Sequence, residues 1–547
     1  MTVAGGQNEA GHESQWLNRW GLVVVLLAFL LTSLSAVGKP VTSMEMNRND
    51  AACYLILADN LVYHGVYSMS RSEPYLPHTE WPPGTPLLYT VPVALSGGLP
   101  APSTVWLFHA WTLLISLLSL VALYRWAKLF VDVPIALAVT AVTAFSRAFL
   151  DSGQATVADT AAVGAAFFCL RLVHMKFSGT TGQRPNPFVF YGSLALLPLT
   201  KPYLGLVFVA WLWRILTRLD TWSDRFRQLM MMAICCVPFA GFIVYSVVAA
   251  QATETISAVT WLTTSNPVEF REGVDAASDA ITLGERLETA RHTLQYFLVY
   301  HIVHSPLPIL DWAGLRDWPL ACRGIVVVLV GLAMITGLLV NAGRTLRAEF
   351  SYGAALIAFF VLFECESARY FTVLTPLCAM CVFVGTHDLL QRFRWRLPEL
   401  KLVHAALAVA AVSGVCWSQR QLAADIDPDP LFADIYSALR IARDDDRIET
   451  LNVPLWLRDL AIVETHKPVT GNAEPQVSDV TTSGTAVLQV SPDATEGRPR
   501  PGSEVAEQVS ANELCFVSRD GRVRLFLVNA DALPAALVRN SAETTGL

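Results

Sequence analysis

Apolar runs follow one another from residue 20 to residue 417, and few folds can accommodate such a series. The chain is 53% hydrophobic and only 16% charged, whereas soluble domains carry roughly 25% charged residues. A helix of about 17–25 apolar residues spans a bilayer. The predicted spans are 20–37, 104–124, 134–150, 156–175, 188–199, 202–216, 229–250, 324–340, 352–363, 371–386 and 403–417. We therefore predict an all-α polytopic membrane domain with about 11 transmembrane helices, or up to about 13 because some runs are short and 293–310 is also moderately apolar.

Charge and cysteine content narrow the choice of function. A net charge of −7 without any basic cluster argues against a nucleic-acid partner. Most of the ten cysteines lie in or beside apolar runs, which predicts buried free thiols rather than disulfides or metal ligands. Cys378 and Cys381 form a C-x-x-C pair, but this pair lies inside an apolar run.

Lysine and arginine are concentrated in alternate loops, and this bias orients the membrane domain. The basic loops contain Arg125, Lys128, Lys176, Arg184, Arg214, Arg218, Arg225, Arg227, Arg344, Arg347, Arg392, Arg394, Arg396 and Lys401. The alternate loops 39–83, 147–156 and 251–321 contain many acidic residues and are therefore placed outside. Residues 1–19 become a cytoplasmic tail. They contain Glu9, Glu13 and a single Arg19, a poor match to the basic start of a signal peptide, which favours a retained first helix over a cleaved signal peptide.

Residues 419–547 are predicted to form a small extracytoplasmic α/β domain after the transmembrane domain 20–418. Helical patterns at 431–442 and 456–465 flank a strand-like run at 449–453. Apolar runs at 514–518 and 523–528 enclose Asp520-Gly521, a hairpin signal. Segment 478–503 is rich in Gly, Pro, Ser and Thr and is predicted to be a loop. No catalytic motif is found in this domain.

The first outer loop, residues 39–103, is too polar to span a membrane and yet has a regular pattern. Apolar residues from Tyr54 to Val62 recur at three- and four-residue steps, which predicts an amphipathic surface helix over 50–64. Gly65 is placed to end that helix, and Trp81-Pro82-Pro83-Gly84 predicts a rigid corner. A helix headed by a carboxylate and followed by a proline corner is a candidate lip of a catalytic site.

Ionisable residues gather at the outer ends of the predicted spans, where each is a functional candidate because charge is costly at membrane depth. They are Asp50, His78, Glu80, Asp151, Asp159, Lys201, Glu364, Glu366 and Arg369. Several also have structural explanations. The alternative is that Asp50 is only a helix cap and that Asp151 is a solvated loop acid. For Lys201 the alternative is a side chain that extends to the membrane–water interface. Arg369 either chelates a phosphate, with Tyr370 donating to the same oxygens, or pairs with a glutamate of its own turn.

Short motifs then follow in a fixed order on one predicted face of the membrane. They are D-x3-Y-x3-A-x2-L-x3-G-x-Y from Asp50 through Tyr54 to Tyr67, P-P-G-x-P-L-L at 82–88, the acid Asp159, L-T-K-P at 199–202 and A-R-Y-x5-P at 368–376. Over about residues 16–418 the chain resembles the GT-C superfamily of integral-membrane glycosyltransferases. It is most similar to the branch of protein mannosyltransferases, aminoarabinose transferases and bacterial lipopolysaccharide-sugar transferases.

The resemblance implies a sugar donor carried on a polyprenyl phosphate and transfer on the outer side of the membrane, with inversion. Asp50 matches the catalytic aspartate of the first loop, and Arg369, Tyr370 and Lys201 would bind the donor phosphate. The remaining site residues would be the acceptor-side acids Asp151, Asp159, Glu80 and His78 and the lip residues Tyr54, Tyr67, Pro82, Pro83 and Gly84. The implied partners are the lipid-linked donor, membrane lipids and a lipid, glycan or protein acceptor.

The chain also departs from its relatives. Ala51 follows Asp50 where many members have Asp-Glu, and Trp81 stands where the aminoarabinose branch often has lysine before the two prolines. The sugar and the acceptor therefore stay open. A divalent metal also stays open, because no cluster is evident beyond Asp50 with Asp151 or Asp159. A transporter of lipid-linked sugars and a non-catalytic scaffold of the same fold are the alternatives. A bacterial inner membrane is the expected location.

Overall fold

A computed structural model represents the full chain, and it divides into two compact units. The first unit is Met1–Gly38, Pro77–Leu88 and Phe108–Gln421, and the second is Lys39–Leu76, Tyr89–Leu107 and Leu422–Leu547. The described residues are 6–34, 48–70, 75–101, 103–153, 158–178, 184–253, 291, 320–342, 347–362, 372–392, 414, 430–454, 458–467, 469–472, 485–490, 513–517 and 523–527. Each unit has its own hydrophobic core.

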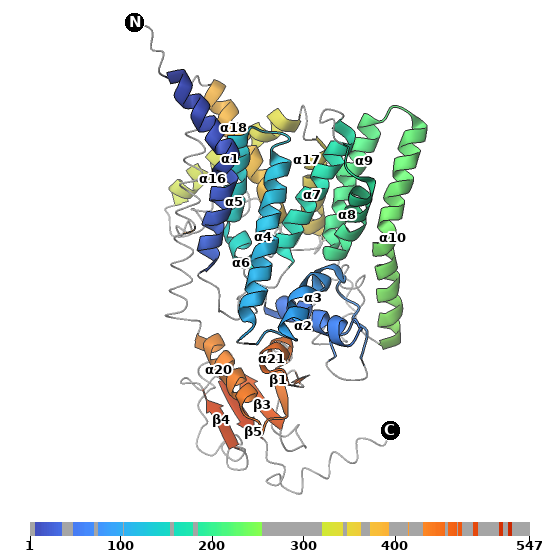
Figure 1. The fold of residues 1–547 in the computed structure, drawn as a ribbon, viewed down its shortest axis with the longest axis vertical. Coiled ribbons are helices and arrows are strands. Elements are labelled where there is room, and N and C mark those ends of the chain that lie inside the picture. The colour runs from blue at the N-terminus through green and yellow to red at the C-terminus, as the bar shows by residue number, and fades with distance from the viewer. Residues whose placement is uncertain are drawn as a thin grey trace. The chain divides into compact units, whose positions relative to one another are not determined.

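The first unit is a bundle of helices. They are α1 (Gly6–Ser33), α4 (Val105–Ala127), α5 (Val133–Ala144), α6 (Arg147–Ser152), α7 (Asp159–Ser178), α8 (Pro187–Thr200), η2 (Pro202–Leu206), α9 (Val207–Arg218), α10 (Trp222–Thr253), α16 (Leu320–Ala342), α17 (Arg347–Leu362) and α18 (Thr375–Arg392). Helix α7 packs against α8 and α9, α9 against α17, and α5 against α1 and α18 (Figure 1). The predicted spans that fall on described residues lie largely on helices, with a break in 134–150, whereas 293–310 and nearly all of 403–417 lie outside them.

The predicted span 134–150 is divided into α5 and α6 rather than forming one helix. Ser146, between them, has extended geometry with φ −66° and ψ 143°. Its hydroxyl donates to the carbonyl of Thr143 at 2.8 Å. Serine side chains compete for backbone groups in this way and so favour helix ends over helix interiors. The sequence pattern did not reveal the break because apolar residues continue across it.

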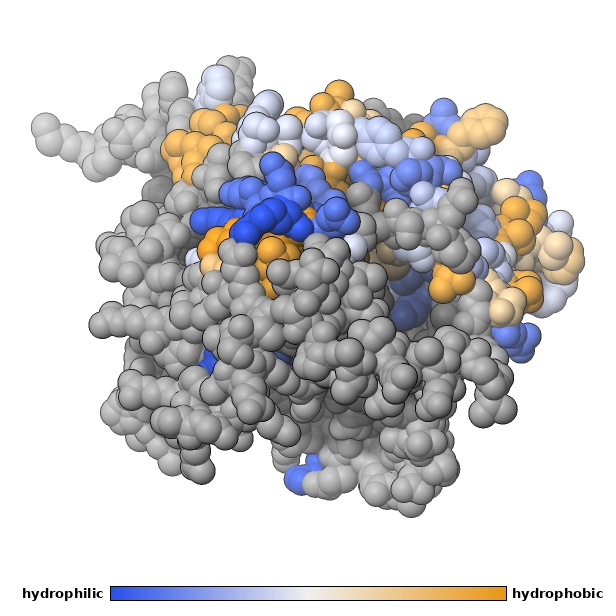
Figure 2. All heavy atoms as spheres, turned by 90° about the horizontal axis from the view of Figure 1, so that it is seen from below, coloured by the Kyte–Doolittle hydropathy of each residue, from blue (hydrophilic) through white to orange (hydrophobic). Residues whose placement is uncertain are grey.

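Three described helices are long and apolar enough to cross a membrane: Val105–Ala127, Asp159–Ser178 and Trp222–Ala252. Several other helices are apolar but shorter. Helix α10 exposes large apolar side chains along its length, including Trp222, Phe226 and Val248. Figure 2 shows hydrophobic surface at the right-hand edge of the view, the side on which Figure 1 draws α10. Such a surface is suited to lipid, because lipid tails are as apolar as the side chains.

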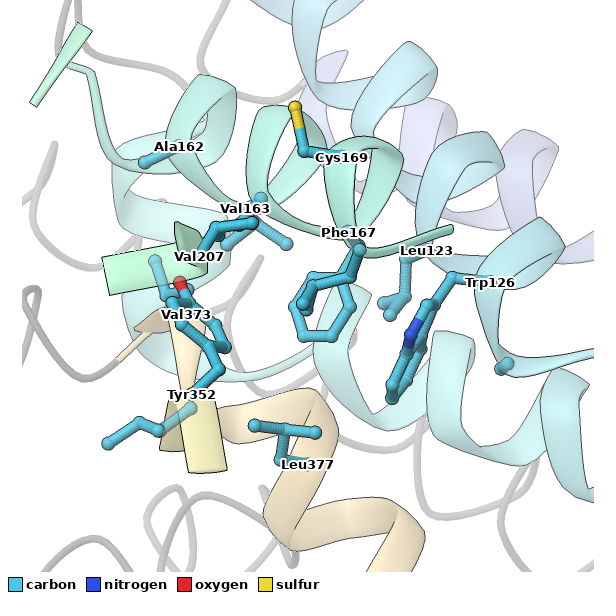
Figure 3. Packing of buried hydrophobic residues seen from close by; sticks show 14 of the residues in the cluster. Leu123, Trp126, Ala162, Val163, Phe167, Cys169, Val207, Tyr352, Val373 and Leu377 are labelled. Atoms are coloured by element: carbon cyan, nitrogen blue, oxygen red, sulfur yellow. The ribbon is translucent and has the colours of Figure 1, made fainter. Parts of the chain in front are cut away.

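The core of the first unit is built from aromatic and branched side chains that come from several helices. In Figure 3, Phe167 of α7 lies beside Trp126 of α4, and their ring centroids are 4.5 Å apart with an edge-on geometry. Tyr352 of α17 and Val207 of α9 gather on the other side of Phe167 (Figure 3). Helix α7 is therefore the central helix of this core.

Helices α16 and α18 approach each other closely at two glycines. A Cβ added to Gly385 would collide with backbone atoms of Ala333 and Gly337, and one added to Gly337 would collide with the backbone of Cys381. Both helices thus present small residues four positions apart, Ala333 with Gly337 and Cys381 with Gly385. Membrane helices use this spacing to bring their backbones together.

The second unit combines the first outer loop, apart from Pro77–Leu88, with the C-terminal domain. Its outer-loop helices are α2 (Arg48–Tyr63) and the later part of α3 (Gly84–Ser96). The C-terminal domain contains α20 (Pro430–Asp444), α21 (Arg458–Thr465) and the strands β1 (Thr450–Pro454), β2 (Val469–Asn472), β3 (Thr485–Val490), β4 (Glu513–Val517) and β5 (Val523–Leu527). The sheet has the order β2-β1-β3-β5-β4. Strand β1 is parallel to β2 and β3, whereas β5 is antiparallel to β3 and β4.

The predicted α/β character of this domain is confirmed, and so is the hairpin, since β4 and β5 pair with Leu514 opposite Phe526. The loop predicted at 478–503 is wrong for residues 485–490, which form the central strand β3. Its sequence TAVLQV is a short apolar run inside a polar segment. Ala486, Val487 and Leu488 are fully buried there, as expected for a strand covered on both faces.

Candidate functional site

Asp159 and Lys201, predicted separately from the sequence, form a buried ion pair in the first unit. Asp159 lies in the first turn of α7, where the helix dipole stabilises a carboxylate. Lys201 lies in the break between α8 and η2, and Pro202 after it favours its extended conformation. Lys201 Nζ donates to Asp159 Oδ1, and the two residues are 7% and 0% exposed. The Lys201 side chain therefore does not extend to the membrane–water interface, and the purely structural explanation of its position is wrong.

The acidic member of this pair has hydrogen-bonding capacity that the described part of the chain leaves unused. The second carboxylate oxygen of Asp159, Oδ2, is buried and has no hydrogen-bond partner within the described part of the chain. The ring of Tyr203 lies 5.7 Å from Lys201 Nζ, within the range of a cation–π contact. A lysine ammonium is a hydrogen-bond donor with a full positive charge, so the pair places a buried cation beside a buried carboxylate.

The proline corner of the outer loop packs against the backbone that carries Lys201. A Cβ added to Gly84 would lie 2.5 Å from the carbonyl oxygen of Leu199 and 2.8 Å from the nitrogen of Thr200. Thr85 Oγ1 donates to the carbonyl of Thr200 at 2.9 Å. Leu199 and Thr200 directly precede Lys201, so these contacts fix the backbone that carries the lysine. We call Gly84 and Thr85 the backbone seat of Lys201. Only glycine permits this close approach.

The segment that contains the corner is fixed at both ends. Ser246 Oγ of α10 donates to the carbonyl of Thr79 at 2.5 Å, and Trp111 Nε1 of α4 donates to the carbonyl of Leu88 at 2.8 Å. Pro82 is buried between these anchors, whereas Pro83 is half-buried. The predicted rigidity of the corner thus has a physical basis in tertiary hydrogen bonds as well as in its two prolines.

The two ionisable candidates on this segment have different surroundings. His78 Nε2 accepts a hydrogen bond from the backbone nitrogen of Trp81 at 3.3 Å, and the two rings meet edge-on. His78 is therefore engaged within its own turn. Glu80 is half-buried. Asp151, at the end of α6, pairs with Arg147 of the same helix at 3.4 Å and is partly exposed.

Helix α2 of the second unit carries the predicted base. Asp50 lies half-buried in its first turn, where the helix dipole favours a carboxylate. Tyr54, predicted to line the lip, is 7% exposed, and Tyr67 is half-buried beyond the helix. Gly65 has φ +67°, the left-handed conformation that ends helices, so the predicted helix stop is confirmed.

Sequence analysis missed two buried polar residues on α2, Asp59 and Asn60, which are 4% and 0% exposed. Asn60 Nδ2 donates to the carbonyls of Ser68 and Ser70 at 2.6 and 2.8 Å. This side chain therefore holds the loop after Gly65 against the helix. The signal was present in the sequence, since two polar residues interrupt an otherwise apolar stretch.

A second buried charge cluster also escaped sequence analysis. Arg214 of α9 donates to both carboxylate oxygens of Glu349 on α17, each at 3.2 Å. It also lies 3.1 Å from His174 Nδ1 of α7. Arg214 was read only as part of a basic loop, yet it is 4% exposed. The cluster joins three helices at the opposite end of α7 from Asp159.

Two predicted phosphate ligands, Arg369 and Tyr370, lie outside the described residues, as do Glu364 and Glu366. Among the described residues, no group of three or more His, Cys, Asp or Glu side chains is arranged to hold a metal ion. Asp159 itself is bound to a lysine rather than to other acids. The described residues therefore do not fit a divalent metal site.

Comparisons with known proteins identify the fold. No family model and no curated protein sequence matches this chain. Two crystal structures of ArnT from Cupriavidus metallidurans are similar to it, one bound to undecaprenyl phosphate with a TM-score of 0.54 and one in the apo state with a TM-score of 0.55. Each is 14% identical and covers 94% of this chain and 99% of that chain. At this identity the likeness shows a shared fold, so the fold that the resemblance predicted is confirmed.

Proposed function

We propose that the protein is an inverting glycosyltransferase that moves a sugar from a polyprenyl-phosphate donor to an acceptor hydroxyl on the outer face of a membrane. The observation that carries this proposal is the fold shared with ArnT along nearly the full length of both chains. The buried lysine on its backbone seat adds a chemical reason, because the reaction needs a cation for its leaving group.

In the proposed reaction Asp50 is the general base. Its carboxylate takes the proton from the acceptor hydroxyl, and the oxygen of that hydroxyl forms the new bond to the anomeric carbon. The bond between the anomeric carbon and the donor phosphate oxygen breaks, and its electron pair leaves with the polyprenyl phosphate. Attack opposite to the leaving group inverts the anomeric centre. A transition state with oxocarbenium character is expected, as in glycoside hydrolysis.

Lys201 is assigned to the leaving phosphate, together with Arg369 and Tyr370. Charge accumulates on the phosphate oxygens as the glycosidic bond breaks, and a fixed cation in a water-poor environment stabilises that charge strongly. Asp159 orients the lysine through the hydrogen bond from Lys201 Nζ to Asp159 Oδ1. Asp151, Glu80 and His78 are assigned to the acceptor side of the site, where Asp151 and His78 also have partners within their own turns.

The arginine and lysine bias of the loops supports an outward-facing site, with the C-terminal domain on the same side. The proposed location is a bacterial inner membrane. The proposed acceptor is a lipid, glycan or protein that reaches that face.

Release of polyprenyl phosphate is the direct test. Membranes that contain the wild type are incubated with a panel of polyprenyl-phosphate sugars, and the liberated lipid phosphate is quantified. Lys201→Ala is expected to lower the rate by about a hundredfold, as for other leaving-group donors. The control is Lys176→Ala, because Lys176 lies over the rings of Phe190 and Tyr191, far along α7 from Asp159. Equal loss in both variants, or no release with any donor, would contradict the proposal.

A further inference from the structure

Helix α21 of the C-terminal domain packs against α2, the helix in whose first turn Asp50 lies. Both helices belong to the second unit. In sequence they are separated by almost the whole transmembrane domain, so this packing is a long-range contact that the fold has to build. It connects a domain without a catalytic motif to the helix that carries the proposed base.

The buried apolar side chains of α21 fall into two groups. Leu460 and Ala461 belong to the hydrophobic core of the C-terminal domain. Ile462 and Val463 are 4% and 1% exposed, yet neither belongs to that core. Among the described elements, α2 packs against α21, and its residues from Ala51 to Ala58 are all buried. We therefore assign α2 as the partner of the second buried face of α21.

A polar contact follows directly after that face. His466 lies three residues after Val463 and four after Ile462, and its φ of +59° turns the chain at the end of α21. Its Nε2 lies 3.3 Å from the carbonyl oxygen of Pro100. The residues just before Pro100 lie beside α2, since a Cβ added to Gly98 would be 3.7 Å from Asp59 Oδ1. The first outer loop is thus held at two points by one short helix.

We propose that the C-terminal domain is a positioning domain for the catalytic base, and that Ile462, Val463 and His466 form its positioning face. These residues do not touch the reacting atoms. They fix α2, and through it the place of the Asp50 carboxylate. A displacement of about 1 Å in a reacting group can cost roughly a hundredfold in rate, so this support has a catalytic consequence. The inference rests on the proposed function for the role of Asp50.

The experiment compares two valine-to-alanine variants of the full-length protein in lipid nanodiscs. Val463→Ala removes methyl groups from the positioning face, whereas Val453→Ala removes the same groups from β1 in the domain core, where Val453 is 0% exposed. Hydrogen exchange is measured in peptides that cover residues 50–63. We expect Val463→Ala to speed exchange in α2 by about tenfold and Val453→Ala to leave it within about twofold, because only the former loosens the contact with α2.

Transfer kinetics give the second readout. Val463→Ala is expected to lower kcat at unchanged KM for the donor, because the donor phosphate ligands are intact while the base is displaced. Exchange in α2 that is equal in the two variants, or unchanged in both, would overturn the inference. If Val463→Ala does not fold, His466→Ala replaces it, with an expected severalfold increase in exchange. The exchange readout does not depend on turnover, so an inactive wild type would refute the proposed function alone.

Discussion

Removal of one partner of the buried cluster formed by Arg214, Glu349 and His174 is expected to be far more damaging than removal of a similar pair on the surface. Arg214 and Glu349 have side chains 5% and 1% exposed, and they meet at 3.2 Å. Arg214→Ala leaves the Glu349 carboxylate buried without its cation. Breaking a buried pair in this way costs about 3–5 kcal/mol.

The chain supplies a matched control for this substitution. Arg227 pairs with Asp224 at 3.0 Å, but its side chain is 72% exposed. Exposed pairs contribute about 0–1 kcal/mol, so Arg227→Ala is expected to have little effect on the free energy of unfolding. The two variants remove the same side chain from ion pairs of similar length, and they differ in burial.

The assay is denaturant unfolding of the purified protein in detergent micelles, followed by intrinsic tryptophan fluorescence. Arg214→Ala is expected to unfold at clearly lower denaturant than the wild type, and Arg227→Ala at nearly the same concentration. The double variant Arg214→Met with Glu349→Leu is expected to recover much of the loss, because apolar replacements remove both charges. Equal destabilisation by Arg214→Ala and Arg227→Ala would refute the reasoning, and so would a double variant as unstable as Arg214→Ala.

Other predictions concern the seat of the lysine and the pH dependence of the C-terminal domain. Gly84→Ala is expected to lower the rate of sugar transfer at least tenfold, because the added Cβ pushes the Lys201 backbone away. Gly192→Ala is the control and is expected to leave the rate unchanged, since its added Cβ meets nothing within 4 Å. Equal activity of the two variants would contradict the role of Gly84 in the seat. Hydrogen bonds from Arg447 lower the pKa of Asp445 to about 2 from 3.8. A depressed carboxyl pKa stabilises the folded state above about 3.8, and this contribution is lost as the pH falls towards about 2. The stability difference between wild type and Asp445→Asn, measured by urea unfolding, should therefore shrink over that range, and a difference that stays constant from pH 5 to 2 would contradict the pairing.

The sequence was most informative where a local pattern determines the structure. The helix of α2, the left-handed Gly65 and the hairpin of β4 and β5 each depend on a few neighbouring residues, and all three are found. The prediction that α2 is an amphipathic surface helix is wrong, because all of its residues from Ala51 to Asn60 are buried. Ordered motifs with weak individual signals also identified the fold. These motifs were informative together because the order of the helices in one fold places the motifs at the same ends of those helices.

Contacts between distant segments were beyond the reach of these patterns. The pairing of Asp159 with Lys201, and the seat that Gly84 provides, depend on how α7, α8 and the outer loop pack. Arg214 was interpreted by its neighbours in the sequence, which are basic, whereas its partner Glu349 lies 135 residues away. Strand β3 was missed because its stability comes from β1 and β5 on either side rather than from its own flanks.

Asp50 is the residue on which the proposed chemistry depends, and its conversion to asparagine tests the account most directly. Transfer of radiolabelled sugar from a polyprenyl-phosphate donor is measured for the wild type, Asp50→Asn and the control Asp132→Asn, whose exposed carboxyl makes no cap hydrogen bond to α5. We expect normally folded Asp50→Asn to lose about a hundredfold or more of the rate, because an amide cannot accept the acceptor proton. Asp132→Asn should match the wild type. Equal transfer by all three proteins would contradict Asp50 as the base.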